Sequence, residues 1–572
     1  MSKFIWKYKK LDATDINKIS DAFKLPYSIA TIMSLKKINT KELSRSFFYH
    51  DLNNLHDPML MKDMDKAIDR VIQAKESNQA ILIIGDYDTD GTSAAAILQL
   101  YFQSLNIDSY YYIPHRQKEG YGISKKAIDY GIKIGAQLII SCDCGITAVD
   151  QIDYANQNQL DFIVTDHHKQ KDKLPNAYAI LNPNQHDCAY PFKGLCGAGV
   201  AFKLCLGINT ALDNHIDNVF KYLDLVAIAT TADVMPVLDE NRIIISEGMK
   251  RIIRGSNKGI KSLMNVSNLN NPGLTAGKLG YWFIPKINAA GRLGDASRAV
   301  KLFTTPNLQL ANEIAIDLEN ENNKRKAITL QHENEAISII NSQINLDDQK
   351  IIILYNQNWH FGIIGIVASR VKELYNRPTI VMTEEDGVYK GSCRSIPGYD
   401  IVEALNSCSD LLDNYGGHPM AAGLSIKKEH LETFSSNINN HAIKNLSSDL
   451  TPVISIDSEL KLSEINDRFI NFLNYLEPFG PGNSKPVFVT KDLKGISNVQ
   501  LLGKDRETLK FKLNSTQSDL DVIGFRMVEH YEKLLSGRNI DIAYTIDKNY
   551  WNGQYSTQLV LKDIIFSDDR KN

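Results

Sequence analysis

The sequence has few cysteines and no long apolar run. Its 572 residues include only seven cysteines, an odd number without regular spacing. Such a set does not form a disulfide framework and is typical of a reducing compartment. No apolar stretch approaches the roughly 20 residues that a membrane-spanning helix needs, and the N-terminal MSKFIWKYKK lacks the apolar core of a signal peptide. We therefore expect a cytoplasmic protein that does not enter a membrane.

An excess of positive charge is also missing. The chain has 64 Lys and Arg against 67 Asp and Glu, a net charge of -3. This balance excludes the overall basicity of a histone-like coating protein, so a polyanion must be bound by a local patch. The motif G-x-x-x-x-G-K-S/T does not occur, so a nucleotide-driven motor is not indicated. The 43% hydrophobic and 23% charged residues are close to average for soluble proteins.

The pattern of the chain predicts three structured parts. Between residues 79 and 180, short apolar runs alternate with helical patterns, which predicts a parallel sheet with strands at 80–85, 109–114, 136–141, 161–166 and 177–183. The stretch 308–344 has no glycine or proline after Pro306 and predicts a long amphipathic helix. A second α/β pattern follows, and short β-rich segments begin at Pro452, which suggests a small Greek-key barrel such as an OB-fold.

The first acidic motif follows the first predicted strand. Asp86 and Asp88 lie in DYDTDG, at the end of a strand where an open α/β sheet places its ligands. Residues two apart in extended backbone share a face, so both carboxylates can point at one cation. An EF-hand also opens with D-x-D-x-D-G, but its twelfth position would be Ile97 instead of glutamate, and a strand precedes it instead of a helix. We therefore favour a strand-end metal site.

Further acids and two histidines follow other strands. Asp143 lies in SCDCG, Asp166, His167 and His168 lie in TDHH, and Asp233 ends an apolar run in ATTADV. A zinc site with the two flanking cysteines is conceivable, but C-x-C on a strand sends both thiols to the face opposite Asp143, and packed small hydrophobes are the favoured interpretation. Carboxylates with a minority of imidazoles suit Mn²⁺ or Mg²⁺. So many acids predict two ions about 3.5–4 Å apart, which clamp a phosphoryl centre and activate water.

These motifs resemble a known family. DYDTDG, SCDCG, TDHH and TADV, in this order, resemble the four motifs of the DHH phosphoesterase family, and GGHPMAAG (416–423) resembles the signature of its DHHA1 domain. IPHRQKEGYG, PKINAAGRLGDA, GSCRSIPGYD and LEPFGPGN are similar to segments of the family's single-strand-specific exonucleases. The similarity spans nearly the whole chain apart from the first few dozen residues.

The resemblance implies a fold and its divisions. We expect an α/β protein in which a parallel-sheet DHH domain is joined by a long helix to a smaller α/β DHHA1 domain, followed by an OB-like β-barrel. The expected boundaries are 1–45 for an N-terminal segment, 46–305 for the DHH domain, 306–345 for the connecting helix, 346–448 for the DHHA1 domain and 449–572 for the OB domain.

The resemblance also implies the roles of individual residues. It makes Asp86, Asp88, Asp143, His167 and Asp233 metal ligands, with His168 and Asp166 at the same centre in a direct or supporting role. Ile84 departs from relatives that carry a histidine there, which removes one ligand. The implied phosphate contacts are Arg116, Arg292, Ser392, Arg394, Gly416, Gly417 and His418, and the implied catalytic set is Asp88, Asp143, His167, His168, Arg292 and His418.

The expected function is a metal-dependent exonuclease that degrades single-stranded DNA from the 5′ end to mononucleotides, in DNA repair and recombination. Two Mn²⁺ or Mg²⁺ ions are the expected cofactors. The expected partners are single-strand binding protein and a helicase, and the protein is expected to be a monomer. One alternative is a phosphodiesterase for short oligonucleotides or cyclic dinucleotides, but the C-terminal domain and PKINAAGRLGDA favour a polymer. A non-catalytic single-strand-binding scaffold is the other alternative, but it would have no use for mutually repelling carboxylates.

Overall fold

The computed structural model describes residues 4–569 except 121, 270–272, 386, 448, 515–518 and 552–553. It divides into two compact units, one formed by Met1–Glu319 with Val453–Asn572 and the other by Asn320–Pro452. Helix α17 (Leu308–Gln343) begins in the first unit and continues in the second, which confirms the predicted long helix. Within the described part, no helix is long and apolar enough to cross a membrane.

A five-stranded parallel sheet forms the centre of the first unit, as predicted. Its order is β3-β2-β4-β5-β6, with bounds β2 (Ala80–Gly85), β3 (Ser109–Tyr112), β4 (Ala136–Cys142), β5 (Asp161–Thr165) and β6 (Ala179–Leu181). All four pairings are parallel. Every carboxyl end therefore lies at the same edge, where the predicted site residues follow β2, β4 and β5.

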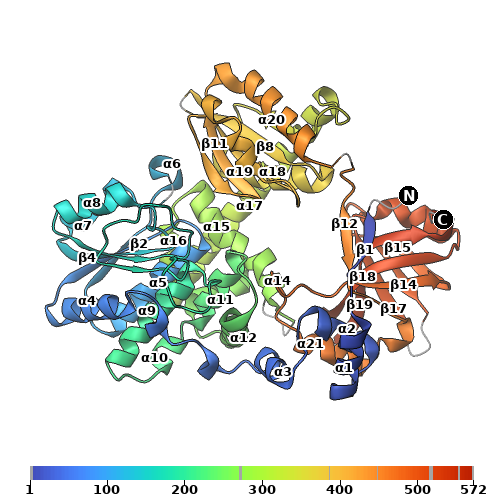
Figure 1. Ribbon diagram of the computed structural model, residues 1–572, viewed down its shortest axis with the longest axis horizontal. Helices are drawn as coiled ribbons and strands as arrows, with labels where there is room; N and C mark the ends of the chain where they lie inside the picture. The colour runs from blue at the N-terminus through green and yellow to red at the C-terminus, as the bar shows by residue number, and fades with distance from the viewer. Residues whose placement is uncertain are drawn as a thin grey trace. The chain divides into compact units, whose positions relative to one another are not determined.

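Helices cover both faces of this sheet. Ile81 and Ile83 of β2 pack into one hydrophobic cluster, and Leu82 and Ile84 pack into another. Figure 1 shows β2 and β4 between α7 (Lys125–Lys133) and α8 (Val149–Gln157) on one side and α4 (Met64–Glu76) and α9 (Gly197–Ala211) on the other. Alternating strand residues are buried on both faces, as in a doubly wound sheet. The remaining helices of this part are α5 (Thr89–Ser104), α6 (Arg116–Glu119), α10 (Asp217–Phe220), α11 (Leu223–Ala232), α12 (Asp239–Arg254), α13 (Lys258–Val266), α14 (Ala276–Lys278), the π-helix η3 (Leu279–Phe283), α15 (Ile284–Leu293) and α16 (Ser297–Thr304).

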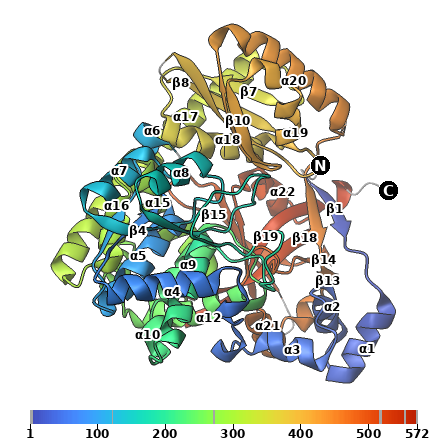
Figure 2. The same cartoon turned by 60° about the vertical axis from the view of Figure 1, so that its left-hand side comes forward.

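The C-terminal part of the first unit is a seven-stranded sheet, ordered β13-β14-β18-β19-β17-β16-β15. Its strands are β13 (Ser458–Glu459), β14 (Phe488–Leu493), β15 (Ile496–Leu502), β16 (Thr508–Leu513), β17 (Leu520–Phe525), β18 (Ile540–Trp551) and β19 (Gln554–Phe566). Figure 2 shows β14, β18 and β19 side by side. Among the described residues, no pairing joins the two end strands, so the β-rich domain is confirmed but the expected barrel closure is not found.

The N-terminal residues pack on this C-terminal sheet. Strand β1 (Ile5–Tyr8) pairs in parallel with β12 (Val453–Ile456), and α1 (Ala13–Phe23) and α2 (Tyr27–Leu35) share a hydrophobic cluster with α21 (Asp467–Tyr475). Figures 1 and 2 both show α2 beside α21. The described residues of 4–35 and of 453–569 therefore form one folded body, a contact that local sequence patterns do not indicate.

The second unit contains a mixed five-stranded sheet, ordered β10-β11-β9-β8-β7. Only β7 and β8 are parallel. Residues of α19 and α20 share one hydrophobic cluster with this sheet. The elements are β7 (Ile352–Tyr355), α18 (Phe361–Tyr375), β8 (Thr379–Glu385), β9 (Val388–Arg394), α19 (Ile401–Asn406), β10 (Asn414–His418), β11 (Ala421–Ile426) and α20 (Leu431–Asn445).

Candidate active site

The first motif forms a tight turn between β2 and α5. Asp86 is buried directly after β2, and Asp88 caps α5 because its Oδ1 accepts from the backbone N–H groups of Asp90 (2.9 Å) and Gly91 (3.0 Å). A Cβ on Gly91 would lie 2.5 Å from the nitrogen of Asp86, so only glycine allows this turn. The helix begins at Thr89, and the cap stabilises its first turn. Asp86 and Asp88 thus lie on either side of Tyr87 at the junction of β2 and α5, and the backbone of Asp88 is extended.

Asp143 follows β4 in the left-handed backbone region, with φ 60°. Gly197, at the start of α9, lies so close that a Cβ there would be 2.5 Å from the Cβ of Asp143. The predicted alternation is wrong here: Cys142 packs in one hydrophobic cluster and Cys144 in another. The strand ends before Asp143, so the period of two does not apply. Burial raises the pKa of the Cys142 thiol to about 12, in keeping with a packed hydrophobe.

The third motif joins an aspartate to two histidines. Asp166 is buried, and both of its carboxylate oxygens accept hydrogen bonds. Its Oδ1 accepts from the backbone N–H groups of His167 (2.7 Å) and His168 (3.1 Å) and also lies 2.7 Å from His168 Nδ1. Its Oδ2 accepts from the backbone N–H of Ile146 (2.9 Å). Burial opposes charge on both partners. Their hydrogen bond and attraction nevertheless raise the pKa of His168 to about 9 and hold the pKa of Asp166 below its usual value. Asp166 therefore orients His168, as carboxylates behind metal-binding histidines do.

His167 connects the second motif with the fourth. Asp233 is the C-cap residue of α11, directly after Ala232. The Nε2 atom of His167 lies 3.1 Å from an oxygen of Asp143 and 3.5 Å from an oxygen of Asp233. One imidazole thus contacts carboxylates from two different motifs.

Three overlapping groups could each hold a metal ion, because their ligand atoms lie within 4.8 Å of one another. They are Asp86 with Asp88 and Asp143, Asp143 with His167 and His168, and Asp90 with His167 and Asp233. Six predicted metal residues are therefore brought together. Asp166 belongs to none of these groups within the described part.

Asp90 is a member of the cluster that the sequence analysis missed. It is fully buried, and its two oxygens accept from the N–H groups of Gly197 and Ala198, both at 2.7 Å, at the N-terminus of α9. Asp90 is the third acid of DYDTDG, and the spacing of the three acids at i, i+2 and i+4 is the sequence signal for it.

The charges of this cluster fit a cation. Burial, followed by repulsion from neighbouring carboxylates, raises the pKa of Asp90 to about 7 and that of Asp233 to about 8, and it raises the pKa values of Asp86 and Asp143 as well. Asp86 Oδ1 is buried without a hydrogen-bond partner in the described part of the chain. A buried carboxylate oxygen without a partner is costly, and a bound cation would supply one. Ile84 packs in the core and offers no donor.

Two predicted arginines lie near the first motif. The Arg116 guanidinium lies over the ring of Tyr87, 5.1 Å from its centroid. Burial raises the pKa of Tyr87 to about 12, and the positive charges of Arg116 and Arg292 oppose that rise. Arg292 is in the last turn of α15. Both cations therefore face the loop that carries Asp86 and Asp88.

The other predicted phosphate contacts lie in the second unit. The Arg394 guanidinium donates to the hydroxyls of Ser392 (3.0 Å) and Ser369 (3.1 Å), and Gly365 of α18 is close beside both Arg394 and Ser392. Gly416, Gly417 and His418 are exposed in β10. This unit therefore presents a guanidinium and hydroxyls on one side of β9.

Comparisons with known proteins agree with this arrangement. Sequence models of the DHH family N-terminal domain, the DHHA1 domain and the RecJ OB domain match residues 80–230, 348–444 and 456–563. The chain is 34% identical over 570 residues to the single-stranded-DNA-specific exonuclease RecJ of Bacillus subtilis, covering 99% of this chain and 71% of the relative. It is 35% identical over 544 residues to RecJ of Haemophilus influenzae, and the match covers 91% of this chain and 93% of the relative. The chain belongs to the RecJ family.

Solved RecJ structures have the same fold. A crystal structure of RecJ from Thermus thermophilus in complex with Mn²⁺ matches with a TM-score of 0.82 and 26% identity, covering 98% of this chain and 80% of that one. The Mg²⁺ complex of the same protein matches in fold with a TM-score of 0.76. RecJ from Thermus thermophilus thus binds the two ions that the carboxylate cluster of this chain is suited to hold.

Proposed function

We propose that this chain is a metal-dependent exonuclease that hydrolyses single-stranded DNA from the 5′ end to mononucleotides. The observation that carries the proposal is the convergence of buried carboxylates and two histidines at one sheet edge, in a member of the RecJ family. Two Mn²⁺ or Mg²⁺ ions are its proposed cofactors. The oligonucleotide or cyclic-dinucleotide phosphodiesterase and the non-catalytic scaffold are not favoured, because the relatives over the full length are exonucleases of single strands.

The proposed ligands are Asp86, Asp88, Asp90, Asp143, His167, His168 and Asp233. When bound, divalent ions activate water and offset charge on the phosphoryl oxygens. Asp166 is a positioning residue in this scheme, because it belongs to none of the three groups in the described part of the chain and its Oδ1 lies 2.7 Å from His168 Nδ1. Arg116 and Arg292 supply positive charge next to the motif-one loop, where a strand's phosphates would lie.

In the second unit, Ser392, Arg394 and His418 are the proposed contacts for a terminal phosphate. Four further proposals rest on the family resemblance. They are a biological role in repair and recombination, a cytoplasmic location, a monomeric state, and single-strand binding protein and a helicase as partners.

The direct test uses purified full-length protein with end-labelled single-stranded DNA, single-stranded RNA and duplex DNA, with Mn²⁺, Mg²⁺ or chelator. We expect mononucleotides from single-stranded DNA alone, with either ion, and none with chelator. A strand cut in its interior, or products longer than one nucleotide, would contradict the exonuclease assignment.

Metal binding should depend on pH through the raised pKa values. The unfolded acids lose their protons near pH 4, whereas folded, metal-free Asp90 and Asp233 retain theirs to about pH 7 and 8. In that window the unfolded state binds fewer protons, so the metal-free protein becomes less stable as pH rises. Divalent ions bind the deprotonated carboxylates, so affinity should rise with pH and protons should be released.

The measurement is the increase in Tm on adding Mn²⁺. It should be larger above pH 8 than below pH 7, and a weakly buffered solution should acidify on mixing. An increase in Tm that does not change with pH would show that these acids do not bind the ion.

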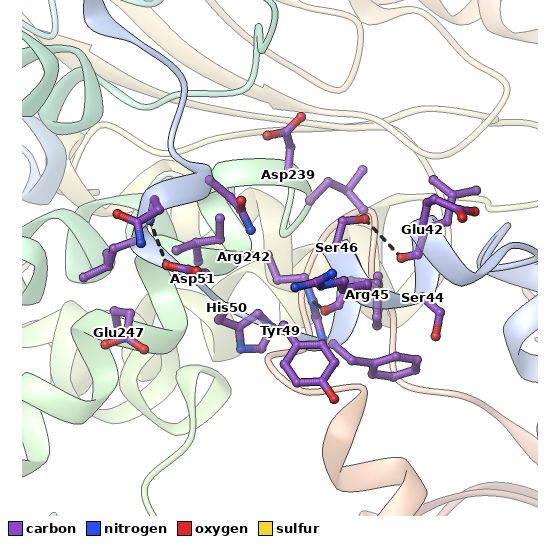
Figure 3. Close-up of a pocket in the computed structure, with 18 of the residues that line it drawn as sticks. Glu42, Ser44, Arg45, Ser46, Tyr49, His50, Asp51, Asp239, Arg242 and Glu247 are labelled. Atoms are coloured by element: carbon purple, nitrogen blue, oxygen red, sulfur yellow. Dashed lines mark hydrogen bonds between the residues drawn. The ribbon is translucent and has the colours of Figure 1, made fainter.

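Arg242 of α12 joins the catalytic part of the first unit to its C-terminal part. Its side chain is 2% exposed and lies over the Phe47 ring, 3.8 Å from the centroid. Figure 3 shows it in the wall of a pocket of about 1650 Å³ between α12 and the segment around α3 (Lys41–Phe48). Its guanidinium donates to five backbone carbonyls, those of Phe47, Tyr475, Leu476, Glu477 and Pro478. All five guanidinium N–H donors can thus be used at one junction.

Arg242→Ala should lower the free energy of unfolding by several kcal/mol, because each buried carbonyl left without a donor costs about 1–3 kcal/mol. It should also raise KM for long strands more than for short ones, because the C-terminal sheet would no longer be fixed to the catalytic part. Denaturant unfolding and strand-length kinetics measure the two effects. Arg251→Ala on the same helix, which loses one bond to the Phe220 carbonyl, is the matched control. Equal effects from both variants would contradict the role of Arg242.

A further inference from the structure

Tyr281 and Trp282 form an exposed aromatic pair on a distorted helix. Their side chains are 68% and 49% exposed, and their rings lie 5.0 Å apart in an edge-to-face arrangement. They lie in the π-helix η3, between α14 and α15. Pro285, four residues after Tyr281, lacks an N–H, and its ring displaces the carbonyl of the residue four positions earlier. The sequence itself therefore produces the π turn that presents the pair, and such turns are frequent at functional sites.

Core packing does not require these two rings. The flanking residues Leu279 and Phe283 are both fully buried and supply the core-facing side of this turn. Two neighbouring large aromatic side chains on a surface form an apolar patch that water solvates poorly, and such patches mark binding sites.

The helical segment that carries the pair contacts residues next to the carboxylate cluster at two places. Gly280 lies against Thr231, to which a Cβ at Gly280 would be 3.5 Å distant, and Thr231 is two residues before Asp233. At the other end, the side-chain oxygen of Asn288 accepts from the backbone N–H (2.9 Å) and hydroxyl (2.8 Å) of Thr89, next to Asp88. Gly280 and Asn288, on either side of the pair in the chain, therefore connect its helical segment to both the fourth and the first motif.

The same helical segment carries a proposed phosphate contact. Asn288 and Arg292 are four residues apart in α15, close to one turn, so they lie on the same side of that helix. The turn η3, which presents the pair, lies directly before α15 in the chain. An aromatic platform at one end and a cation at the other match a short length of single strand, with stacked bases and a neutralised phosphate.

We propose that Tyr281 and Trp282 are a base-stacking platform that holds the single strand beside the carboxylate cluster. The proposal rests on the proposed function and names the group that selects unpaired bases. Every base has a π face, so the platform accepts any sequence, but the bases of a duplex are already stacked and paired and cannot be received. Tyr281 and Trp282 are thus specificity-determining residues for single strands.

The test compares full-length Tyr281→Ala, Trp282→Ala and the double variant with Tyr281→Phe and Trp282→Phe, which keep a ring. The control is Tyr178→Ala. Tyr178 lies outside this helix and is 45% exposed, so the variant also loses one exposed aromatic ring. We expect KM for single-stranded DNA to rise about 5- to 150-fold in each alanine variant, the range for loss of one stacked base, with kcat nearly unchanged. The phenylalanine variants and the control should keep the wild-type KM.

Two further readouts separate stacking from a structural role. On a strand of abasic nucleotides, wild type and alanine variants should have the same KM, because no base remains to stack. The salt dependence of KM should not change, whereas loss of a phosphate contact would lower its slope by about 1. An unchanged KM in the double variant, or an equal KM rise on abasic strands, would overturn the platform. Absence of degradation by wild type would instead overturn the proposed function.

Discussion

Asp143→Asn is expected to lower kcat on single-stranded DNA by at least about 10²- to 10³-fold, the loss seen when one electrostatic stabiliser of a transition state is removed. Asp143 belongs to two of the three groups that could hold an ion, so its loss affects both. Asparagine keeps the side-chain shape and tolerates the left-handed backbone at this position, where φ is 60°. The fold should therefore be retained.

The same substitution should not lower the Tm of the metal-free protein. Burial raises the pKa of Asp143, and repulsion from Asp86, Asp88, Asp90 and Asp233 raises it further. A neutral amide removes this repulsion, so the metal-free variant should be as stable as wild type or more stable. Loss of activity without loss of stability distinguishes a metal ligand from a structural residue.

Single-turnover kinetics and the increase in Tm with Mn²⁺ measure the two effects. The matched control is Asp224→Asn, a buried acid in the first turn of α11 that belongs to none of the three groups in the described part of the chain. It should keep the wild-type kcat and the wild-type response to Mn²⁺. Wild-type turnover by Asp143→Asn at saturating metal would remove Asp143 from the centre.

The parallel sheet and its site were predictable because both depend on local patterns. Apolar runs such as residues 80–85 can be recognised one at a time, and parallel strands bring their carboxyl ends to one edge regardless of the loops between them. Asp86, Asp143 and His167 could therefore be placed together before any contact was known. The long helix at Leu308–Gln343 was predictable for the same reason, since its lack of glycine and proline is a local feature.

Contacts between distant segments were not predictable. Asp90 acts through the N-terminus of α9, more than 100 residues away in sequence, and Arg242 acts through carbonyls more than 230 residues away. Backbone carbonyls and N–H groups have no side-chain signature, so a sequence pattern cannot show where they collect. Whether the C-terminal sheet closes into a barrel cannot be predicted from local patterns either, because pairing between the end strands depends on twist and bulges accumulated over the whole sheet.

Polarity of degradation should depend on Arg394 in the second unit. A terminal phosphate carries more negative charge than an internal one and exposes oxygens that a planar guanidinium can contact in pairs. The hydroxyls of Ser392 and Ser369 accept hydrogen bonds from Arg394, so the planar guanidinium is held in one orientation before a strand binds. A group held in this way loses little side-chain freedom on binding, which favours affinity.

Arg394→Ala should therefore lower kcat/KM on 5′-phosphorylated strands by about 10- to 150-fold, from the loss of hydrogen bonds to a charged group worth about 1.5–3 kcal/mol. The same variant should change the rate on 5′-hydroxyl strands far less, and Arg394→Lys should recover only part of the loss because an ammonium lacks the planar fork. Arg377→Ala in the same unit is the matched control, because the Arg377 guanidinium donates to the Gln349 carbonyl, and this variant should not distinguish the two kinds of 5′ end.

In wild type, a bulky 5′ block should stop degradation and a 3′ block should not. If the 3′ block is the inhibitory one, or if circular strands are cut as readily as linear ones, the proposed polarity is wrong, while the carboxylate cluster and its metals are unaffected because they were inferred from other residues.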